Sequence, residues 1–148
     1  MSAQDEDPVA ARRRQARENA EYHRAAAARA KEAEARRTAP MVAEFAEAMR
    51  AAQVPTSALR AKPHSGPGTL RTDVTGWYVR RDRSAGVGTD GQWYVLVVAP
   101  SLRGRLTGVH VDASPAPLQV GAGGRDGDSI ELAKLLALRL EAGADFPS

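Results

Sequence analysis

Large apolar side chains are spread unevenly along the chain, and their densest run lies at residues 93–98. This run follows Asp90-Gly91, a dipeptide that favours the tight type I′ turn of a β-hairpin. The pattern predicts a central hairpin that pairs residues 85–89 with 92–96 and places Val87 opposite Tyr94. An alternative register pairs residues 77–81 with 93–97 across a longer loop. Because successive side chains of a strand alternate, Trp93 and Tyr94 are expected on opposite faces, one in the core and the other toward a partner.

The N-terminal quarter of the chain lacks an apolar stripe. Between residues 5 and 39 the large apolar side chains are only Val9 and Tyr22. Alanine, arginine and glutamate are strong helix formers, so a long exposed helix, partly frayed, is expected at residues 8–37. Pro40 is expected to break this helix and to start another. Apolar residues at helical spacing predict a core helix from Met41 to about Gln53.

Beyond residue 53 the hydrophobic pattern alternates between extended and helical periods. Residues 54–69 contain several prolines and glycines and are expected to form a turn and a loop. Besides the hairpin, the pattern predicts extended segments at residues 74–81, 105–111 and 118–120. Asp128 and Glu131 form a capping-box pattern before a leucine-rich helix, which Gly143 is expected to end.

These elements predict the α+β class. The expected order is a long exposed N-terminal helix, a second core helix, an antiparallel sheet of three to four strands, and a C-terminal helix that covers the sheet. Leu132, Leu136 and Leu140 are the expected cover of one sheet face. Residues 1–37 form the exposed charged extension, helical or partly disordered, and residues 38–148 form a single small domain.

Composition narrows the expected setting of the protein. The 148 residues include no cysteine, and arginine outnumbers lysine 18 to 3 in an alanine-rich sequence, a bias typical of GC-rich bacterial coding. The acidic start lacks the basic and apolar regions of a signal peptide. No apolar run approaches the roughly 18 to 20 residues that span a bilayer. We therefore expect a soluble, cytoplasmic bacterial protein with no membrane contact.

Positive charge is concentrated in the sheet region. Residues 50–105 hold nine basic and three acidic side chains, whereas residues 106–148 hold three basic and six acidic ones. Arginines that neutralise phosphates, with aromatic rings that stack on bases, suit a nucleic-acid surface. Alternatively, the arginines form a solvated sheet face and the tryptophans belong to the core. The candidate binding residues for nucleic acid or another partner are Arg60, Lys62, Arg71, Arg80, Arg81, Arg83, Arg103, Arg105, Trp77 and Tyr94. A second group, expected to dock a partner through the N-terminal helix, is Arg12, Arg13, Arg14 and Arg17.

No motif in the sequence carries a specific chemistry. The three histidines lack metal-ligand spacing, and His110 with Asp112 is the one local pairing that suits a general base. The glycine-rich loop at residues 121–129 lacks the lysine of a phosphate-binding P-loop. The acids at positions 126, 128 and 131 are too few for a calcium loop. We therefore expect no catalytic residue, no metal and no cofactor.

The sequence favours macromolecular binding, as an adaptor or regulatory module that is not an enzyme. The first alternative is a nucleic-acid-binding protein that uses an arginine-rich, aromatic-containing sheet face. The second is a structural or assembly component of a larger particle, with the N-terminal helix as its docking arm. A protein partner is favoured over a nucleic acid.

Overall fold

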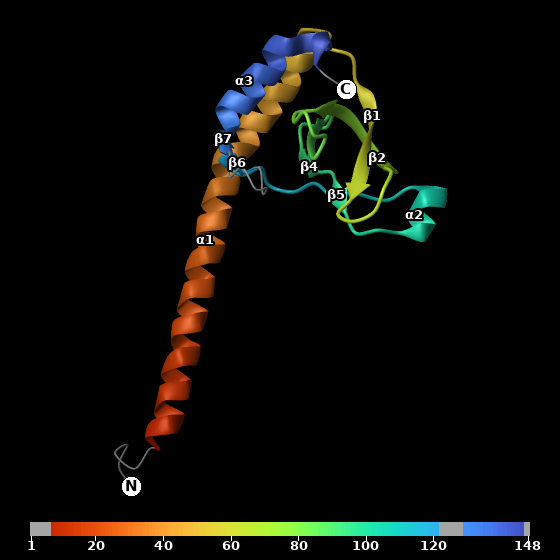
Figure 1. Ribbon diagram of the computed structural model, residues 1–148. Coiled ribbons are helices and arrows are strands. Elements are labelled where there is room, and N and C mark those ends of the chain that lie inside the picture. Colours follow the sequence, from red (N-terminus) through yellow and green to blue (C-terminus); the bar gives the residue numbers. More distant parts are fainter. Residues whose placement is uncertain (1–6, 122–128, 147–148) are drawn as a thin grey trace. The chain divides into compact units, whose positions relative to one another are not determined.

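The computed structural model describes residues 7–121 and 129–146 and has the α+β class that the sequence predicts (Figure 1). The chain divides into two compact units, Met1–Glu34 and Ala35–Ser148. The second unit contains the sheet, the apolar core and the C-terminal helix. Among the helices in the described part of the chain, none combines the length and the apolar character that crossing a membrane demands.

Helix α1 (Pro8–Ala51) continues through the position where a break was predicted. The break at Pro40 was wrong, although proline has no N–H to donate to the carbonyl four residues earlier. The helix is buried on both sides of the proline, since Thr38 and Val42 are 0% and 2% exposed. Burial of one continuous face thus outweighs a penalty of about 3 kcal/mol. This face consists of Thr38, Val42, Phe45, Ala46 and Met49.

The N-terminal unit has no core of its own. None of residues 7–34, all of which the structure describes, is buried. Helical propensity and side-chain pairs one turn apart hold this part in shape. For example, Arg14 and Glu18 lie 3.9 Å apart, and Gln15 donates a hydrogen bond of 3.1 Å to Asn19. The long exposed N-terminal helix is confirmed.

A mixed five-stranded sheet forms the centre of the second unit. In spatial order its strands are β4 (Trp93–Val95), β3 (Ala85–Gly88), β2 (Leu70–Tyr78), β1 (Ser57–Pro63) and β5 (Val97–Val98). Neighbouring strands are antiparallel, except that β1 and β5 are parallel. The end strands β4 and β5 are separated in the chain only by Leu96, whose N–H donates to Ser84 and whose carbonyl accepts from Lys62, both at 2.8 Å. The sheet is therefore strongly curved, so that its two edge strands, β4 and β5, are consecutive parts of one segment of chain.

Strand β1 occupies residues that were predicted as a turn and a loop. Leu59 and Ala61 are both fully buried, whereas Arg60 is exposed and Lys62 is half-buried. This alternation is the pattern of a strand with one buried face. The prolines and glycines on either side concealed it in the sequence.

The β3–β4 hairpin forms as predicted, but its register is shifted by one residue. Val87 lies opposite Trp93 and not opposite Tyr94. A shift of one residue reverses which side chains of one strand share a face with those of its partner. Val87 and Trp93 therefore point together toward the helices, into the main core.

The turn of this hairpin explains the shift. It is a three-residue loop, Thr89–Gly91, closed by a 3.0 Å hydrogen bond from the Gly91 N–H to the Gly88 carbonyl. Gly91 has a φ of 77°, as expected for a type I turn followed by a left-handed glycine. The Asp90 carboxylate accepts from the Gln92 N–H at 3.0 Å and stabilises this longer turn over the predicted two-residue one.

Apolar clusters lie on both faces of the sheet. The main core packs Trp77, Val87 and Trp93 against α1 and the C-terminal helix. The second cluster consists of Leu59, Val74, Tyr94, Leu96 and Val111. Trp93 and Tyr94 thus lie on opposite faces as expected, but both are buried, at 3% and 8% exposure. The expectation that one of them faces a partner was wrong, because the second face is also closed.

The strand predicted at residues 105–111 begins as a helix. Helix α2 (Leu102–Thr107) is capped by Ser101, whose hydroxyl accepts from the Gly104 N–H at 2.9 Å. Only an isolated bridge between Thr72 and Val109 remains of the predicted strand.

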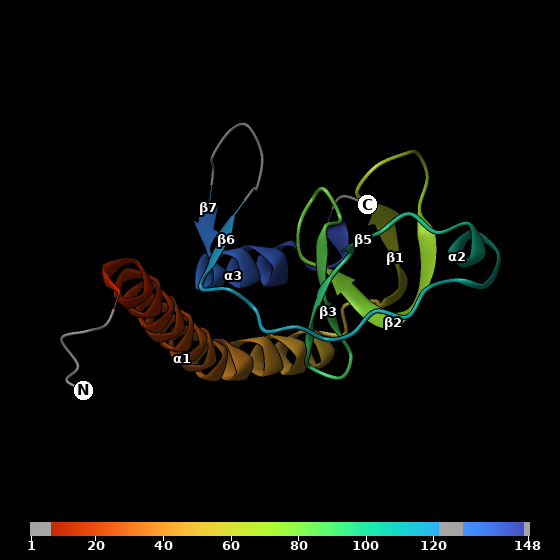
Figure 2. The same cartoon turned by 90° about the horizontal axis from the view of Figure 1, so that it is seen from below.

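The C-terminal helix α3 (Leu132–Ala142) starts later than its capping box predicted. Residues just before it form β7 (Ser129–Glu131), which pairs with β6 (Gln119–Gly121), while the predicted cap Asp128 lies outside the described residues. Gly143 ends the helix as expected and begins the short helix η2 (Gly143–Asp145). Leu132 and Leu136 are buried against the main core, and α3 lies beside the C-terminal part of α1 (Figure 2).

Candidate binding surface

The predicted basic residues of the sheet region divide into two groups. The first group lies where the β1–β2 connection meets α2. Arg60 and Arg71 are cross-strand neighbours. Arg71 donates to the Leu106 carbonyl of α2 at 2.9 Å, and α2 itself carries Arg103 and Arg105. Arg60 donates to the Thr69 hydroxyl at 2.7 Å and to the Thr69 carbonyl at 3.2 Å, so both arginines of this pair also bind within the chain. Two like charges directly opposite on a sheet are unfavourable, so an anionic neighbour would relieve their repulsion.

The second group lies around the turn between β2 and β3, and most of its members bind within the chain. Lys62 donates to the Asp82 carbonyl at 2.9 Å. Arg80 lies 3.5 Å from the Asp82 carboxylate, and the Arg83 guanidinium lies over the Tyr78 ring at 5.2 Å. Arg81 is exposed. These contacts tie three of the four side chains to the fold and leave less charge for a ligand.

The predicted aromatic binding residues lie in the interior. Trp77 is 2% exposed and donates to the Val54 carbonyl at 3.1 Å. Tyr94 donates from its hydroxyl to Asp90. Burial, followed by the hydrogen bond to Asp90, raises the pKa of Tyr94 to about 12. Neither ring is placed to stack on a base.

Helix α2 presents a ridge that the sequence analysis missed. Leu102 and Leu106 are 83% and 79% exposed, the highest values among the large apolar side chains described. They lie four residues apart and so on one face of the helix. The signal in the sequence was this spacing together with the capping serine, but the alternation of residues 105–111 masked it.

The two leucines face solvent because the opposite side of α2, at Gly104, packs against the rest of the protein. Gly104 is buried, and a Cβ at this position would lie 2.6 Å from the Val109 side chain. At 100° per residue, Leu102 and Leu106 lie on the side opposite Gly104, while Arg103 and Arg105 flank the ridge. Both arginines form backbone hydrogen bonds, from Thr107 to the Arg103 carbonyl and from the Arg105 N–H to Ser101, but neither guanidinium forms a hydrogen bond or ion pair with a described residue. We call Leu102, Leu106, Arg103 and Arg105 the α2 ridge.

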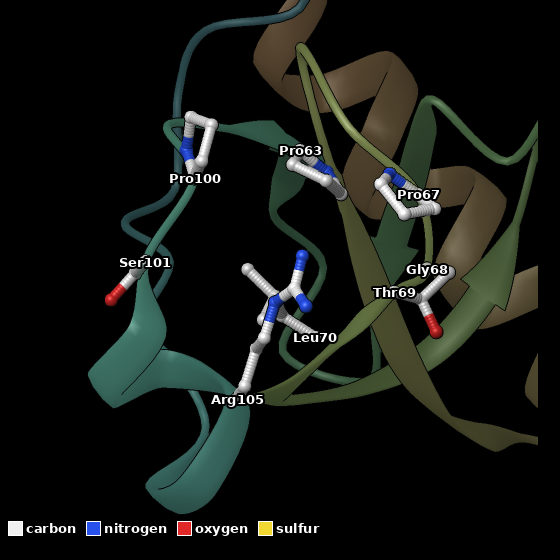
Figure 3. A pocket seen from close by; sticks show the side chains of 8 residues that line it. All are labelled: Pro63, Pro67, Gly68, Thr69, Leu70, Pro100, Ser101 and Arg105. Carbon is white, nitrogen blue, oxygen red and sulfur yellow. The ribbon is translucent and has the colours of Figure 1, made fainter.

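A cavity of about 210 Å³ adjoins the α2 ridge (Figure 3). The Arg105 side chain points into it, toward Leu70 and between Pro63 and Pro100. Its lining consists of Pro63, Pro67, Gly68, Thr69, Leu70, Pro100, Ser101 and Arg105. The cavity thus combines walls of proline and leucine with the polar side chains of Thr69, Ser101 and Arg105.

A cluster of Asp73, His110 and Asp112 anchors the segment that follows α2. Asp73 accepts from the Val111 N–H at 3.1 Å and from His110 Nδ1, and His110 Nε2 lies 2.7 Å from Asp112. The hydrogen bond to Asp73, then that to Asp112, raises the pKa of His110, and the same contact lowers the pKa of Asp73. The local sequence pattern pairs His110 with Asp112 only, because Asp73 is distant in the chain.

Both ring nitrogens of His110 are therefore held by carboxylates. This arrangement stabilises the doubly protonated imidazolium, whereas a general base needs a free ring nitrogen. We call this cluster the His110 clasp. It ties β2 to the segment that follows α2.

The predicted docking residues Arg12, Arg13, Arg14 and Arg17 lie in the N-terminal unit, on an exposed part of α1. Residues 122–128 of the glycine-rich loop, which include the acids at positions 126 and 128, lie outside the described residues. Glu131 is the N-cap residue of α3, without a capping hydrogen bond from its side chain.

Comparisons of this chain with protein-family models, with curated proteins and with solved structures return no match. Its function is therefore inferred from its own geometry.

Proposed function

We propose that residues 35–148 form a protein-binding module and that the α2 ridge is its docking surface. The module acts as an adaptor or regulator and not as an enzyme. The observation that carries this proposal is the exposure of Leu102 and Leu106, at 83% and 79%, on a helix whose other face is fixed by a buried glycine. Exposure of these two leucine side chains to water is unfavourable, and a partner that covers them would remove this cost.

The arginines define the chemistry of the partner. Arg103 and Arg105 flank the leucines, and Arg60 and Arg71 lie nearby. A partner that covers the ridge therefore gains from carboxylates placed around an apolar contact. The adjoining hollow of about 210 Å³ suits one apolar side chain of that partner. We propose an acidic protein segment with at least one exposed apolar residue.

Nucleic acid fits this surface less well. Arginines at phosphate-binding positions support it, but Trp77 and Tyr94 are buried and offer no stacking platform. The phosphate backbone also offers no apolar group that could cover the two leucines of the ridge. Nucleic-acid binding is accordingly an outcome that the test must distinguish.

The test is affinity purification of the full-length protein from its native cells, with and without nuclease. Wild type is compared with the double variant Leu102→Ser/Leu106→Ser. We expect a protein retained by wild type, insensitive to nuclease and lost by the variant, and its binding should weaken as salt rises. A direct titration of the purified pair then measures the loss of affinity, which we expect to reach at least about tenfold.

The matched control is Val95→Ser, which changes another exposed apolar residue, in β4 and outside α2, and should retain the partner. Retention of the partner by the α2 double variant would overturn the ridge as the docking surface. Loss of all retained protein on nuclease treatment, with recovery of bound nucleic acid, would favour the nucleic-acid alternative.

A second candidate function is a structural or assembly role that uses the N-terminal helix as a docking arm. It is supported by residues 7–34, none of which is buried. A partner lost on deletion of residues 1–34 but kept by the α2 double variant would favour this role. The cysteine-free, arginine-rich composition supports a bacterial cytoplasmic setting for either role.

A further inference from the structure

Arg139 of α3 carries a buried positive charge. The residue is 6% exposed. Its Nε donates to the Tyr78 carbonyl at 2.7 Å and its Nη1 to the Gly143 carbonyl at 2.8 Å. The Phe146 ring lies over the guanidinium, 4.2 Å from it. No described carboxylate forms an ion pair with this group. Its charge is stabilised instead by the two carbonyl oxygens and by the face of the Phe146 ring.

An isolated buried charge is unfavourable, and the pKa of Arg139 reflects this. Burial lowers the pKa of Arg139 below its ordinary value, because desolvation penalises the charged form. A guanidinium has five N–H donors. The hydrogen bonds to Tyr78 and Gly143 use two of them, and Nη2 donates to no described residue. A guanidinium presents its donors as a planar fork that pairs well with a carboxylate, and the two donors of Nη2 remain for such a partner.

Arg139 also lines a cavity of about 840 Å³ between α3 and the end of β2. This volume lies within the range of small-molecule sites, roughly 300 to 1,000 Å³. A smaller cavity of about 140 Å³ shares the Arg139 and Phe146 walls. The apolar lining of the larger cavity consists of Val79, Ile130, Leu135, Leu138, Ala142 and Phe146.

The other charged residues that line the larger cavity are Arg80, Arg81, Asp82, Glu141 and Asp145. Asp82 is committed to Arg80 and to Ser84, whose hydroxyl and N–H both donate to it. Glu141 and Asp145 are exposed to water, which screens their repulsion of an anion. The desolvated guanidinium is screened far less. Attraction at Arg139 therefore dominates over repulsion at the rim.

We propose that this cavity binds an apolar carboxylate, with the carboxylate on Arg139 and the apolar body against Leu135 and Leu138. Two sources share this chemistry, a free fatty acid of medium length and the C-terminal residues of an apolar peptide. The ligand supplies the counter-charge that the fold withholds from Arg139 and covers the apolar wall. This site is separate from the α2 ridge and does not depend on the function proposed for it.

The test is titration of the full-length ¹⁵N-labelled protein, followed by NMR, with named probes. Sodium octanoate represents the free acid, and 1-octanol is the uncharged match of equal length. Acetyl-Ala-Leu-Leu with a free C-terminus represents the peptide, and its C-terminal amide is the uncharged match. We expect shifts confined to resonances of Val79, Ile130 and residues 135–146, with one charged probe bound at least about tenfold more tightly than its uncharged match.

Two variants test the residues. Leu138→Asp places a negative charge on the cavity wall at a residue that is 49% exposed, so folding is retained. It should weaken binding of the charged probe at least about tenfold, whereas Val9→Asp, at an equally exposed residue that does not line the cavity, should leave it unchanged. Arg139→Lys keeps the charge but loses the fork, and it should also weaken binding.

Equal binding of charged and uncharged probes would overturn the role of Arg139. Unchanged binding by Leu138→Asp, or no shift with any probe, would overturn the site itself. Failure here leaves the α2 ridge untouched, since no residue of the ridge lines this cavity.

Discussion

The His110 clasp couples the attachment of residues 110–112 to β2 to the ionisation of His110 and Asp73. The pKa of His110 is raised, so its contribution to stability is complete below the ordinary value of about 6.5 and is lost as pH rises through the raised value. The pKa of Asp73 is lowered from 3.8, so its contribution is complete above that value and is lost as pH falls through the lowered one. The clasp is therefore strongest between about pH 4 and pH 6.5.

We predict that His110→Gln destabilises the protein more at pH 5.5 than at pH 8.5. At the lower pH the wild-type imidazolium is held by two carboxylates, and at the higher pH part of that charge is gone. Denaturant unfolding at both pH values measures the difference. His64→Gln, at an exposed histidine outside the clasp, serves as the control. An equal loss of stability at the two pH values would show that the clasp is not electrostatic.

At the scale of elements, α1 contains the clearest conflict between local preference and packing. Pro40 is exposed on a helix that is buried on its other side, so it contributes little to the core. We predict that Pro40→Ala raises the free energy of unfolding by about 1 to 3 kcal/mol, because the new N–H completes the helical hydrogen bonds. Urea unfolding of the full-length chain measures this change.

The control for Pro40 is Ala39→Gly, in the same turn. It should lower the free energy of unfolding by about 1 kcal/mol if this region is helix interior in solution. An unchanged or lower stability of Pro40→Ala would mean that the proline contributes contacts that outweigh its lost hydrogen bond.

The elements that the sequence predicted correctly are those with strong local signals. The apolar spacing of the last helix and its terminal Gly143 located α3, and the Asp90-Gly91 turn located the hairpin. The errors arose where tertiary contacts, and not the local sequence, determine the length of a helix or the register of a hairpin. Burial of Thr38 carries α1 past Pro40, and the hydrogen bond from Gln92 to Asp90 selects a three-residue turn. Neither effect can be read from a local period.

The binding residues were harder to predict than the fold, for a related reason. Charge counts found Arg103 and Arg105 but could not separate them from Arg80, which the fold uses internally. Nor could the sequence show that Leu102 and Leu106 remain uncovered, because hydrophobicity alone indicates burial. The partners of His110 and the isolation of Arg139 both depend on residues distant in the chain.

At the scale of the whole molecule, the two units differ in what they contribute to stability. None of residues 7–34 is buried, whereas Thr38 and Val42 belong to the buried face of α1. We predict that deletion of residues 1–34 leaves the remaining chain folded, with a melting temperature within a few degrees of wild type. Circular dichroism and calorimetry check this.

Deletion of residues 1–42 is the matched comparison. It removes Thr38 and Val42 and should lower stability by roughly 3 kcal/mol or more, because it uncovers part of the main core. If the shorter deletion already unfolds the protein, residues 1–34 have contacts in solution that stabilise the second unit.

The closure of the sheet limits how this protein can recognise another. Many domains bind an extended peptide by adding it as one more strand, through backbone groups at an open sheet edge. Here β4 pairs with β3, and β5, which follows it in the same segment of chain, pairs with β1. The two edge strands of the sheet are therefore only three and two residues long. Trp93 is also bridged to Ser114. A margin so short offers no template for an incoming strand. Binding of the proposed partner would therefore depend on side chains, which would make it sensitive to single substitutions on the binding surface.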